Sequence, residues 1–578
     1  TLILDNKKTN KNCAQLIRTM CNCLKSEVIT GDALSTIVRK LENFNEIDEG
    51  TALKIIQFST LIIWNHFLEM HIFQSILSLI LSYCTSYNEL VSTSAIAAAG
   101  QIVSSFFEFS RDKNDTLTAV NKRDIDLCFS MSCDKSIAFD NHIYKVTYLV
   151  IRDFVRLACG QSALWLRVQN FKVDVAYEMI ENIIKDRFSI LTTSEHFERL
   201  ISESIKASYS QKAPLSFCVT SMEKFMELMP DACESMFTSF LGDLNKKSPK
   251  LVHSLLFFRS FLLRNASIVV NFCLKCDQNA NLLSSMISSL RVLCEDIEDV
   301  NPVTISLKKR TIDSIPIDPE TFVISAPIEI TVYFVRSCYK AMNSALKILV
   351  SRTWADILLI IQIAASVVTG NSCYLLMQGL HSLVLLTNEL MLDDARGSSI
   401  AAFCTILVTP KGPEADEVKK VAFETVISAI ETNTTAFKGH WMKLMTALSE
   451  FLWQPSGYDF TKYIPIEQVI EIAQSLFSIN DGAVKTREWS MFFIVDILIA
   501  NMSRFEKIWP SVESSFVLLL ESEESQEPSL AAFFKLLRGG FTSESEKPLC
   551  ETIKKLFNSK KFSSETRGQI LEQIHFIL

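Results

Sequence analysis

Apolar residues recur at three- and four-residue steps along almost the whole chain, and few residues interrupt them. Only 15 glycines and 14 prolines punctuate 578 residues, whereas a β-sheet protein of this length would need many more tight turns. Because 48% of the residues are hydrophobic, the chain can bury a large core. The pattern predicts an all-α fold.

The first stretch predicts helices joined by short polar segments, over residues 10 to 26, 30 to 44, 50 to 66, 69 to 87 and 92 to 110. Each helix has an apolar stripe too wide for one neighbour to cover. Helix pairs of this kind bury their faces by stacking, with a period near roughly 40 residues in HEAT and armadillo arrays. No strict repeat is visible, so we expect an α-α superhelix of degenerate HEAT/armadillo-like helical repeats.

The segment NELVSTSAIAAAGQIVSSFFEF, residues 88 to 109, has small residues where a core helix usually carries Leu. One of its faces consists of Val91, Ala95, Ala99, Ile102 and Phe106. Small side chains let a neighbouring helix approach toward the lower end of the usual range of about 8 to 10 Å. Gly100, beside this face, suggests the same close approach.

Three other segments bear on the organisation of the chain. Residues 110 to 128 are rich in charge and are predicted to form a surface loop, and residues 295 to 327 carry four prolines and are the best candidate for a linker. The longest uncharged run, residues 357 to 388, is broken at 369 to 372 into pieces shorter than the ~20 apolar residues a bilayer needs. We therefore expect two buried helices joined by a turn there.

The net charge is −8, and the short basic clusters are isolated from one another, so no nucleic-acid partner is expected. The 16 cysteines are scattered through apolar segments. They are interpreted as small buried residues of a protein in a reducing compartment, which favours the cytosol.

The sequence contains none of the common nucleotide-binding, hydrolase or metalloprotease motifs. The pair Cys273 and Cys276 is interpreted as structural, because no second pair of ligands lies near it in the sequence. The eight histidines do not form a pair at metal-ligand spacing with a supporting carboxylate. We therefore expect no catalytic residue, no metal site and no cofactor, and we predict that the protein is not an enzyme.

Two segments near the start of the chain resemble family motifs. The helix at 88 to 109 shares Ser94, Ala95, Ala97, Gln101, Val103, Phe107 and Glu108 with the end of one domain type. The segment ALWLRVQNFKVDVAYEMIENII shares Trp165, Leu166, Glu178, Met179, Ile180 and Glu181 with the start of another. These domains are the dimerisation and cyclophilin-binding (DCB) and homology-upstream (HUS) domains, and the chain resembles the Mon-two family, cytosolic scaffolds related to the large Arf exchange factors.

The resemblance continues in the family's order. NASIVVNFCLKCDQNANL is similar to a degenerate copy of the HUS box. Only Cys276 and Asp277 remain of the Asn-Tyr-Asp-Cys-Asp core of that box. LMLDDARGSSIAAFCTIL keeps Arg396, Ile400, Ala402 and Cys404, but has Gly397 and Ser399 at an Asp and an aromatic position. FKGHWMKLMTALSEFLW resembles a Gly-to-Trp helix start shortened by one residue. NMSRFEKIWPSV is the closest segment, through Asn501, Met502, Arg504, Glu506 and Trp509.

The resemblance implies four parts: a DCB-like domain over residues 1–160 without its first helices, a HUS-like domain over 161–298, a linker over 299–327, and downstream HEAT-like repeats over 328–578. The chain would then be an N-terminal half of such a protein.

The resemblance also implies a non-catalytic scaffold, peripherally bound from the cytoplasm to trans-Golgi network and endosome membranes. It would recruit Dopey-type proteins and Arf or Arf-like (Arl) small GTPases. Homodimerisation through the first domain is left open. The predicted partner-binding residues are Trp165, Asn271 and Asp277.

Three alternatives remain. The chain could be the regulatory half of an Arf guanine-nucleotide exchange factor, although the Phe-Arg-Leu-Pro-Gly-Glu motif of such enzymes does not occur here. It could be a nuclear transport receptor, which is also an acidic HEAT solenoid. The third alternative is a helical-repeat adaptor outside these families.

Overall fold

The computed structural model describes residues 10–25, 31–42, 48–66, 70–110, 117, 119–168, 171–245, 247–264, 277–295, 319–367, 372–408, 415–452, 459–479, 484–522, 526–559 and 561–577. Within these ranges the chain forms α-helices and short 3-10 helices and contains no β-strand. It divides into two compact units, Thr1–Asp243 and Leu244–Leu578. The all-α prediction is confirmed.

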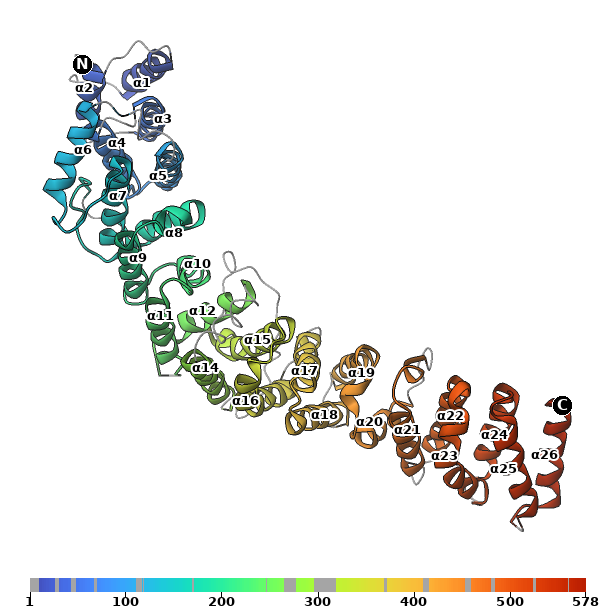
Figure 1. Ribbon diagram of the computed structural model, residues 1–578. Coiled ribbons are helices and arrows are strands. Elements are labelled where there is room, and N and C mark those ends of the chain that lie inside the picture. The colour runs from blue at the N-terminus through green and yellow to red at the C-terminus, as the bar shows by residue number, and fades with distance from the viewer. Residues whose placement is uncertain are drawn as a thin grey trace. The chain divides into compact units, whose positions relative to one another are not determined.

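The first unit is a stack of helices in two layers. Its helices are α1 (Asn10–Lys25), α2 (Gly31–Glu42), α3 (Glu49–His66), α4 (Met70–Tyr83), α5 (Glu89–Ser110), α6 (Ala119–Ser132), α7 (His142–Ala158), α8 (Val173–Leu191), α9 (Glu195–Ser208), α10 (Leu215–Phe225) and α11 (Pro230–Gly242). In one layer α1, α3, α5, α8 and α10 each pack against the next, and α7, α9 and α11 do so in the other (Figure 1).

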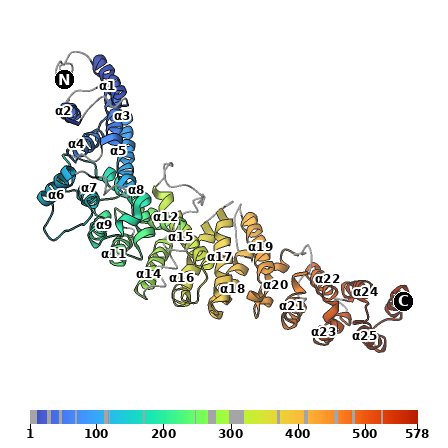
Figure 2. The same cartoon turned by 45° about the horizontal axis from the view of Figure 1, so that its top comes forward.

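The second unit repeats this arrangement. Its first helices are α12 (Leu251–Arg264), α14 (Asp277–Glu295), α15 (Pro319–Lys340), α16 (Leu346–Val367), α17 (Ser372–Glu389), α18 (Asp393–Val408), α19 (Ala415–Thr432) and α20 (Trp441–Ser449). Layer neighbours are α12, α15, α17 and α19 on one side, and α14, α16, α18 and α20 on the other (Figure 2). The helices that follow are α21 (Ile466–Ser478), α22 (Val484–Ala500), α23 (Phe505–Leu520), α24 (Gln526–Gly540), α25 (Glu546–Asn558) and α26 (Ser564–Ile577). The predicted paired-helix superhelix class is thus confirmed within each unit.

The five helices predicted at the start of the chain correspond to α1 to α5, with most ends within two residues and the largest difference, four residues, at the end of α4. Two other predictions are wrong. The expected surface loop at 110 to 128 contains most of α6, which Ile125 and Phe129 anchor through one buried i, i+4 contact. Helix α15 begins at Pro319, inside the expected linker, and continues through Pro327. Pro319 is in the first turn, where proline is tolerated, whereas Pro327 lies inside the helix.

The boundary between the compact units lies between Asp243 and Leu244, within the predicted HUS-like domain. The predicted boundary at residue 160 falls instead inside continuous packing, since α5 and α7 both contact α8. Residues 299–318 of the predicted linker lie outside the described residues. The assignment of family domains stays a prediction.

Helix α5 buries the predicted small-residue face. Val91, Ala95, Ala99, Ile102 and Phe106 are all at most 4% exposed, and α5 packs against α3, α4 and α8. Close approach to α8 does not, however, require the glycine at 100. A Cβ built on Gly100 would lie 3.6 Å from Asn182 Nδ2, which is ordinary van der Waals distance. The small residues thus serve contacts with several helices.

Helix α16 is the one described helix that is long and apolar enough to cross a membrane, by length and composition alone. Half of its most apolar window is buried, and it packs against α14, α15, α17 and α18. Helix α16 ends at Val367 and α17 begins at Ser372, which confirms the interpretation of the uncharged run as two helices.

We predict opposite tolerance at two neighbouring alanines of α5. Ala99 is fully buried, so Ala99→Leu overpacks the contact and lowers the free energy of unfolding by about 1–3 kcal/mol. Ala97 is exposed, so Ala97→Leu changes it by about 0.5 kcal/mol or less. Hydrogen exchange of the α5 amides in the full chain measures both. Equal exchange in the two variants would contradict the packing described here.

Candidate partner-binding surfaces

Trp165 lies in the connection between α7 and α8, where a buried carboxylate holds the backbone. Asp153 of α7 is 0% exposed, and its Oδ2 accepts hydrogen bonds from the backbone N–H of Trp165 at 2.6 Å and of Leu166 at 2.7 Å. Its Oδ1 accepts from Nε and NH2 of Arg152 at 3.0 and 2.8 Å. Charge-assisted bonds of this kind are strong, so Asp153 fixes the path of the connection.

Two bonds tie the same connection to α4. Gln74 donates to the Trp165 carbonyl, and Arg167 N–H donates to Ser78 Oγ at 3.0 Å. The indole of Trp165 packs near Phe73, with ring centroids 6.1 Å apart. The connection therefore joins α4 and α7 ahead of α8.

Of the three predicted partner-binding residues, the structure places only Trp165 completely. Its side chain is 4% exposed, whereas the neighbouring Leu164 is 57% exposed. A partner at this surface could therefore contact Leu164, whereas the Trp165 side chain is buried. Asn271 lies outside the described residues, and so do Cys273 and Cys276. Asp277 is the first residue of α14, but its side chain lies outside the described part. The three residues stay predictions.

The segment around Asn501 and Arg504 joins two helix pairs. Asn501 is 1% exposed and donates to Thr461 Oγ1 and to the Ile497 carbonyl, both at 2.8 Å. Arg504 donates to the carbonyls of Ile464 at 2.6 Å and Thr461 at 2.5 Å, and its NH2 also donates to Asn501 Oδ1. These side chains fasten the turn between α22 and α23 to the segment that precedes α21.

Two buried tryptophans make similar connections. Trp509 Nε1–H donates to Thr552 Oγ1 at 3.1 Å, and Thr552 donates to Glu513 Oε1 at 2.6 Å, which links α23 to α25. Trp441 Nε1–H donates to Gln468 Oε1 at 3.4 Å, which links α20 to α21. Four residues that carry the family resemblance in this unit, Trp441, Asn501, Arg504 and Trp509, therefore have structural roles.

Two departures from the family pattern meet in space. Gly397 on α18 has no side chain, and the ring of His440, which precedes α20, fills that place: a Cβ on Gly397 would lie 2.7 Å from His440 Cε1. Burial lowers the pKa of His440, and Arg396 and Lys443 lower it further. In this chain the His440 ring therefore packs beside position 397, where the family pattern has an Asp side chain.

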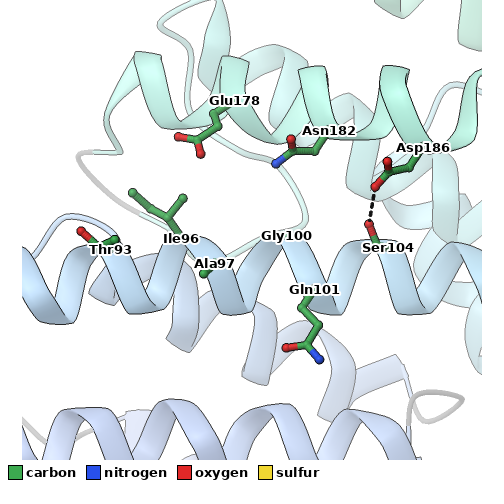
Figure 3. Close-up of a pocket in the computed structure, with 9 residues that line it drawn as sticks. All are labelled: Thr93, Ile96, Ala97, Gly100, Gln101, Ser104, Glu178, Asn182 and Asp186. Carbon is green, nitrogen blue, oxygen red and sulfur yellow. Dashed lines mark hydrogen bonds between the residues drawn. The ribbon is translucent and has the colours of Figure 1, made fainter. Parts of the chain in front are cut away.

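The first unit also has a groove between α5 and α8, with a volume of about 370 Å³ (Figure 3). The nine lining residues are Thr93, Ile96, Ala97, Gly100, Gln101, Ser104, Glu178, Asn182 and Asp186. Ser104 Oγ donates to Asp186 Oδ2 at 3.0 Å. The side chains of Glu178 and Asn182 extend from α8 toward α5. Two carboxylates and no cationic side chain line this groove.

A second groove, of about 480 Å³, lies between α7 and α9. It is lined by three arginines, but their donors are used within the protein. Arg152 is engaged by Asp153, Arg156 donates to the Ser162 carbonyl at 2.9 Å, and Arg199 lies 3.7 Å from Glu203. This groove is therefore lined by cationic as well as acidic side chains, unlike the groove between α5 and α8.

Among the described residues, no group of three His, Cys, Asp or Glu side chains could hold a metal ion. The described cysteines are free thiols. Burial raises the pKa of Cys218 to about 12 and that of Cys404 to about 11, so these thiols are poor nucleophiles at neutral pH.

No family model matches the sequence, and no curated protein matches it. Matching solved structures include Kap121p (11% identity, 97% of this chain and 56% of that one, TM-score 0.32) and importin beta (11%, 98% and 81%, 0.23). The C-terminal fragment of the Chaetomium thermophilum cohesin loader SCC2 also matches (12%, 100% and 54%, 0.27). The chain spans just over half the length of Kap121p. Its fold class rests on its own helices.

We predict that Asp153→Asn loosens the connection that contains Trp165. The substitution leaves the buried Arg152 without its anionic partner, which costs about 3–5 kcal/mol for a broken buried pair. Hydrogen exchange of the Trp165 and Leu166 amides should become faster. Asp140→Asn, at an exposed position before α7, is the control. Unchanged exchange in Asp153→Asn would show that Asp153 does not hold the connection.

We predict that the effect of Gly397→Ala changes sign with the residue at 440. In the natural chain the new Cβ collides with the His440 ring, so stability falls. In a His440→Ala background the collision is gone, and replacing a helical Gly by Ala stabilises by about 0.5–1 kcal/mol. Thermal denaturation of the four proteins gives a coupling free energy of about 0.5–3 kcal/mol for residues in contact. Additive effects would contradict the contact.

Proposed function

We propose that the protein is a non-catalytic scaffold of membrane traffic between the trans-Golgi network and endosomes. It binds peripherally to these membranes from the cytoplasm and recruits Dopey-type proteins and Arf or Arl GTPases. The chain supplies the N-terminal half of the scaffold.

The proposal rests on where the family-like residues lie. Trp165 and Asn501 lie in connections between helices that hydrogen bonds hold in place, and the Trp509 side chain links α23 to α25. A family that shares one stacking geometry shares the residues at such connections, because the backbone there has no regular helical partner. The ordered resemblance therefore concerns the architecture of a scaffold.

The geometry also suits binding without catalysis. Stacked helix pairs present long exposed helix faces and grooves that recruit other proteins. Both described grooves are open and lined by a mixture of polar and apolar side chains. In the first groove Ser104 donates to Asp186, but no histidine or cationic side chain lines the groove beside this pair, so the third member of a nucleophilic site is missing. A scaffold role requires only such exposed helix faces and grooves.

The test is affinity purification of the full-length protein from cells, with imaging of its location. We predict that a Dopey homologue is enriched, that an Arf or Arl GTPase binds in its GTP form, and that the protein colocalises with Golgi and endosome markers. Capture of GTP-loaded Ran with no Dopey homologue would replace the proposal by the transport-receptor alternative.

A paired substitution localises the surface. Leu164→Lys, at 57% exposure beside Trp165, should weaken partner capture, whereas Leu228→Lys, at 45% exposure elsewhere in the same unit, should not. Equal capture by the two variants would remove the Trp165 region from the partner surface and leave the scaffold proposal standing.

A further inference from the structure

We propose that the groove between α5 and α8 binds an α-helix of a partner protein that carries Lys or Arg at four-residue spacing along one side. The inference deepens the scaffold function and rests on it. It names the chemistry of one partner segment and the side chains that select it.

Residues of α5 and α8 on the two walls of the groove face one another at the same four-residue spacing. A Cβ on Gly100 would face Asn182 at 3.6 Å, and four residues later Ser104 bonds to Asp186. The two helices are therefore side by side with the same direction and register over this turn, as Figure 3 shows. Side chains four residues apart repeat every ~6 Å along a helix axis. A third helix laid along the groove meets both rows with the same repeat.

The charge of the groove selects a basic helix. Glu178 and Asp186 are four residues on either side of Asn182. Asp174, one turn earlier on the same face of α8, lies beyond the residues that line the groove. Within the described residues, none of these three carboxylates forms an ion pair. Lys185 is 2.6 Å from Glu181, and Arg187 donates to the carbonyls of Asp186 and Ser104 at 3.3 and 3.5 Å. Lys185 and Arg187 thus lie near this row of carboxylates, but no cationic side chain lines the groove itself, and acidic side chains on a groove wall attract a row of cations.

The environment of Glu178 adds to this attraction. Burial raises the pKa of the Glu178 carboxyl, the neighbouring Glu181 raises it further, and Lys185 lowers it. The Glu178 carboxyl therefore holds its proton more readily than an ordinary Glu side chain does. An ammonium or guanidinium group placed beside it would favour the ionised form.

The shape of the groove fits a helix. Thr93, Ala97 and Gly100 leave the α5 wall low, so a third helix can approach closely. Leu90 lies on the same face, three residues before Thr93, and is 53% exposed. It offers an apolar contact at the end of the groove nearest Glu178. Helix-in-groove recognition uses anchors at this spacing.

A second copy of the chain fits this groove less well. A two-fold contact through it would place Glu178 and Asp186 of one copy against the same carboxylates of the other, and like charges brought together oppose binding. We therefore propose that the groove binds a helix of another protein and not a second copy of this chain.

The binding test uses the purified full chain and two labelled probes of 18 residues. One is an Ala-rich helical peptide with Lys at every fourth position, and the other has Glu at those positions. Fluorescence anisotropy should show binding of the Lys peptide only. The double variant Glu178→Lys/Asp186→Lys should weaken that binding by about tenfold or more, the size expected for two partly exposed ion pairs.

Two further variants separate the groove from general attraction. Ala97→Leu fills the groove and should also weaken binding of the Lys peptide. Asp124→Lys reverses an exposed carboxylate on α6 and should leave it unchanged. Equal affinity of the natural chain and the double variant, or equal loss in Asp124→Lys, overturns the proposal.

A photo-crosslinking amino acid at position 97 of the full-length protein identifies the occupant in cells. A cross-linked segment of another protein with basic residues four apart supports the proposal. A segment of this chain, a second copy, an acidic segment, or no cross-link overturns it. Dopey capture without the basic cross-link would remove only the groove proposal. The cross-link without Dopey capture or Golgi location would remove only the trafficking role.

Discussion

Burial on several sides of single helices is the constraint on which this architecture depends. In α15 the residues from 325 to 335 are all buried, so this part of the helix has no solvent face. It packs against α12, α14, α16 and α17. A helix segment that is buried all round is stable only inside a larger packing, whereas α5 is buried against α3, α4 and α8 and exposes one face. Stacking in layers meets this constraint by giving each inner helix neighbours before and after it in the stack.

Stacking leaves the connections between helices to be stabilised in another way. Their backbone N–H and C=O groups have no regular partners, and buried groups of this kind are costly when unpaired. Asp153 supplies acceptors for two N–H groups before α8, and Arg504 supplies donors for two carbonyls before α21. In each of these two connections, one charged side chain thus supplies hydrogen-bond partners for the backbone. The register between successive helix pairs depends on these side chains.

The sequence predicts well what depends on local periodicity. The bounds of α1 to α5 and the break between α16 and α17 follow from apolar spacing. Helix α6 was missed because only Ile125 and Phe129 are buried in it, which is too short a stripe to detect among charges. The sequence does not reveal the start of α15, because Pro319 and Pro327, which lie in this helix, are equally typical of a linker.

The candidate sites were less predictable because they join residues far apart in the chain. Ser104 and Asp186 are 82 residues apart, and no local pattern announces their contact. Glu178 was noticed as part of a motif, but its position on a groove wall depends on the register of α8 against α5. Trp165 was predicted to bind a partner because of its place in a family-like segment, which does not show whether its side chain is exposed. Asp153, which buries that segment, is twelve residues away.

The central claim is that stability comes from each helix pair and its nearest neighbours. Stretching single molecules of the full chain in an optical trap tests it most directly. The account predicts unfolding in successive steps, each releasing about 40 residues or a small multiple, or about 130 Å of extended chain for one pair. Release of the whole chain in a single step would contradict it.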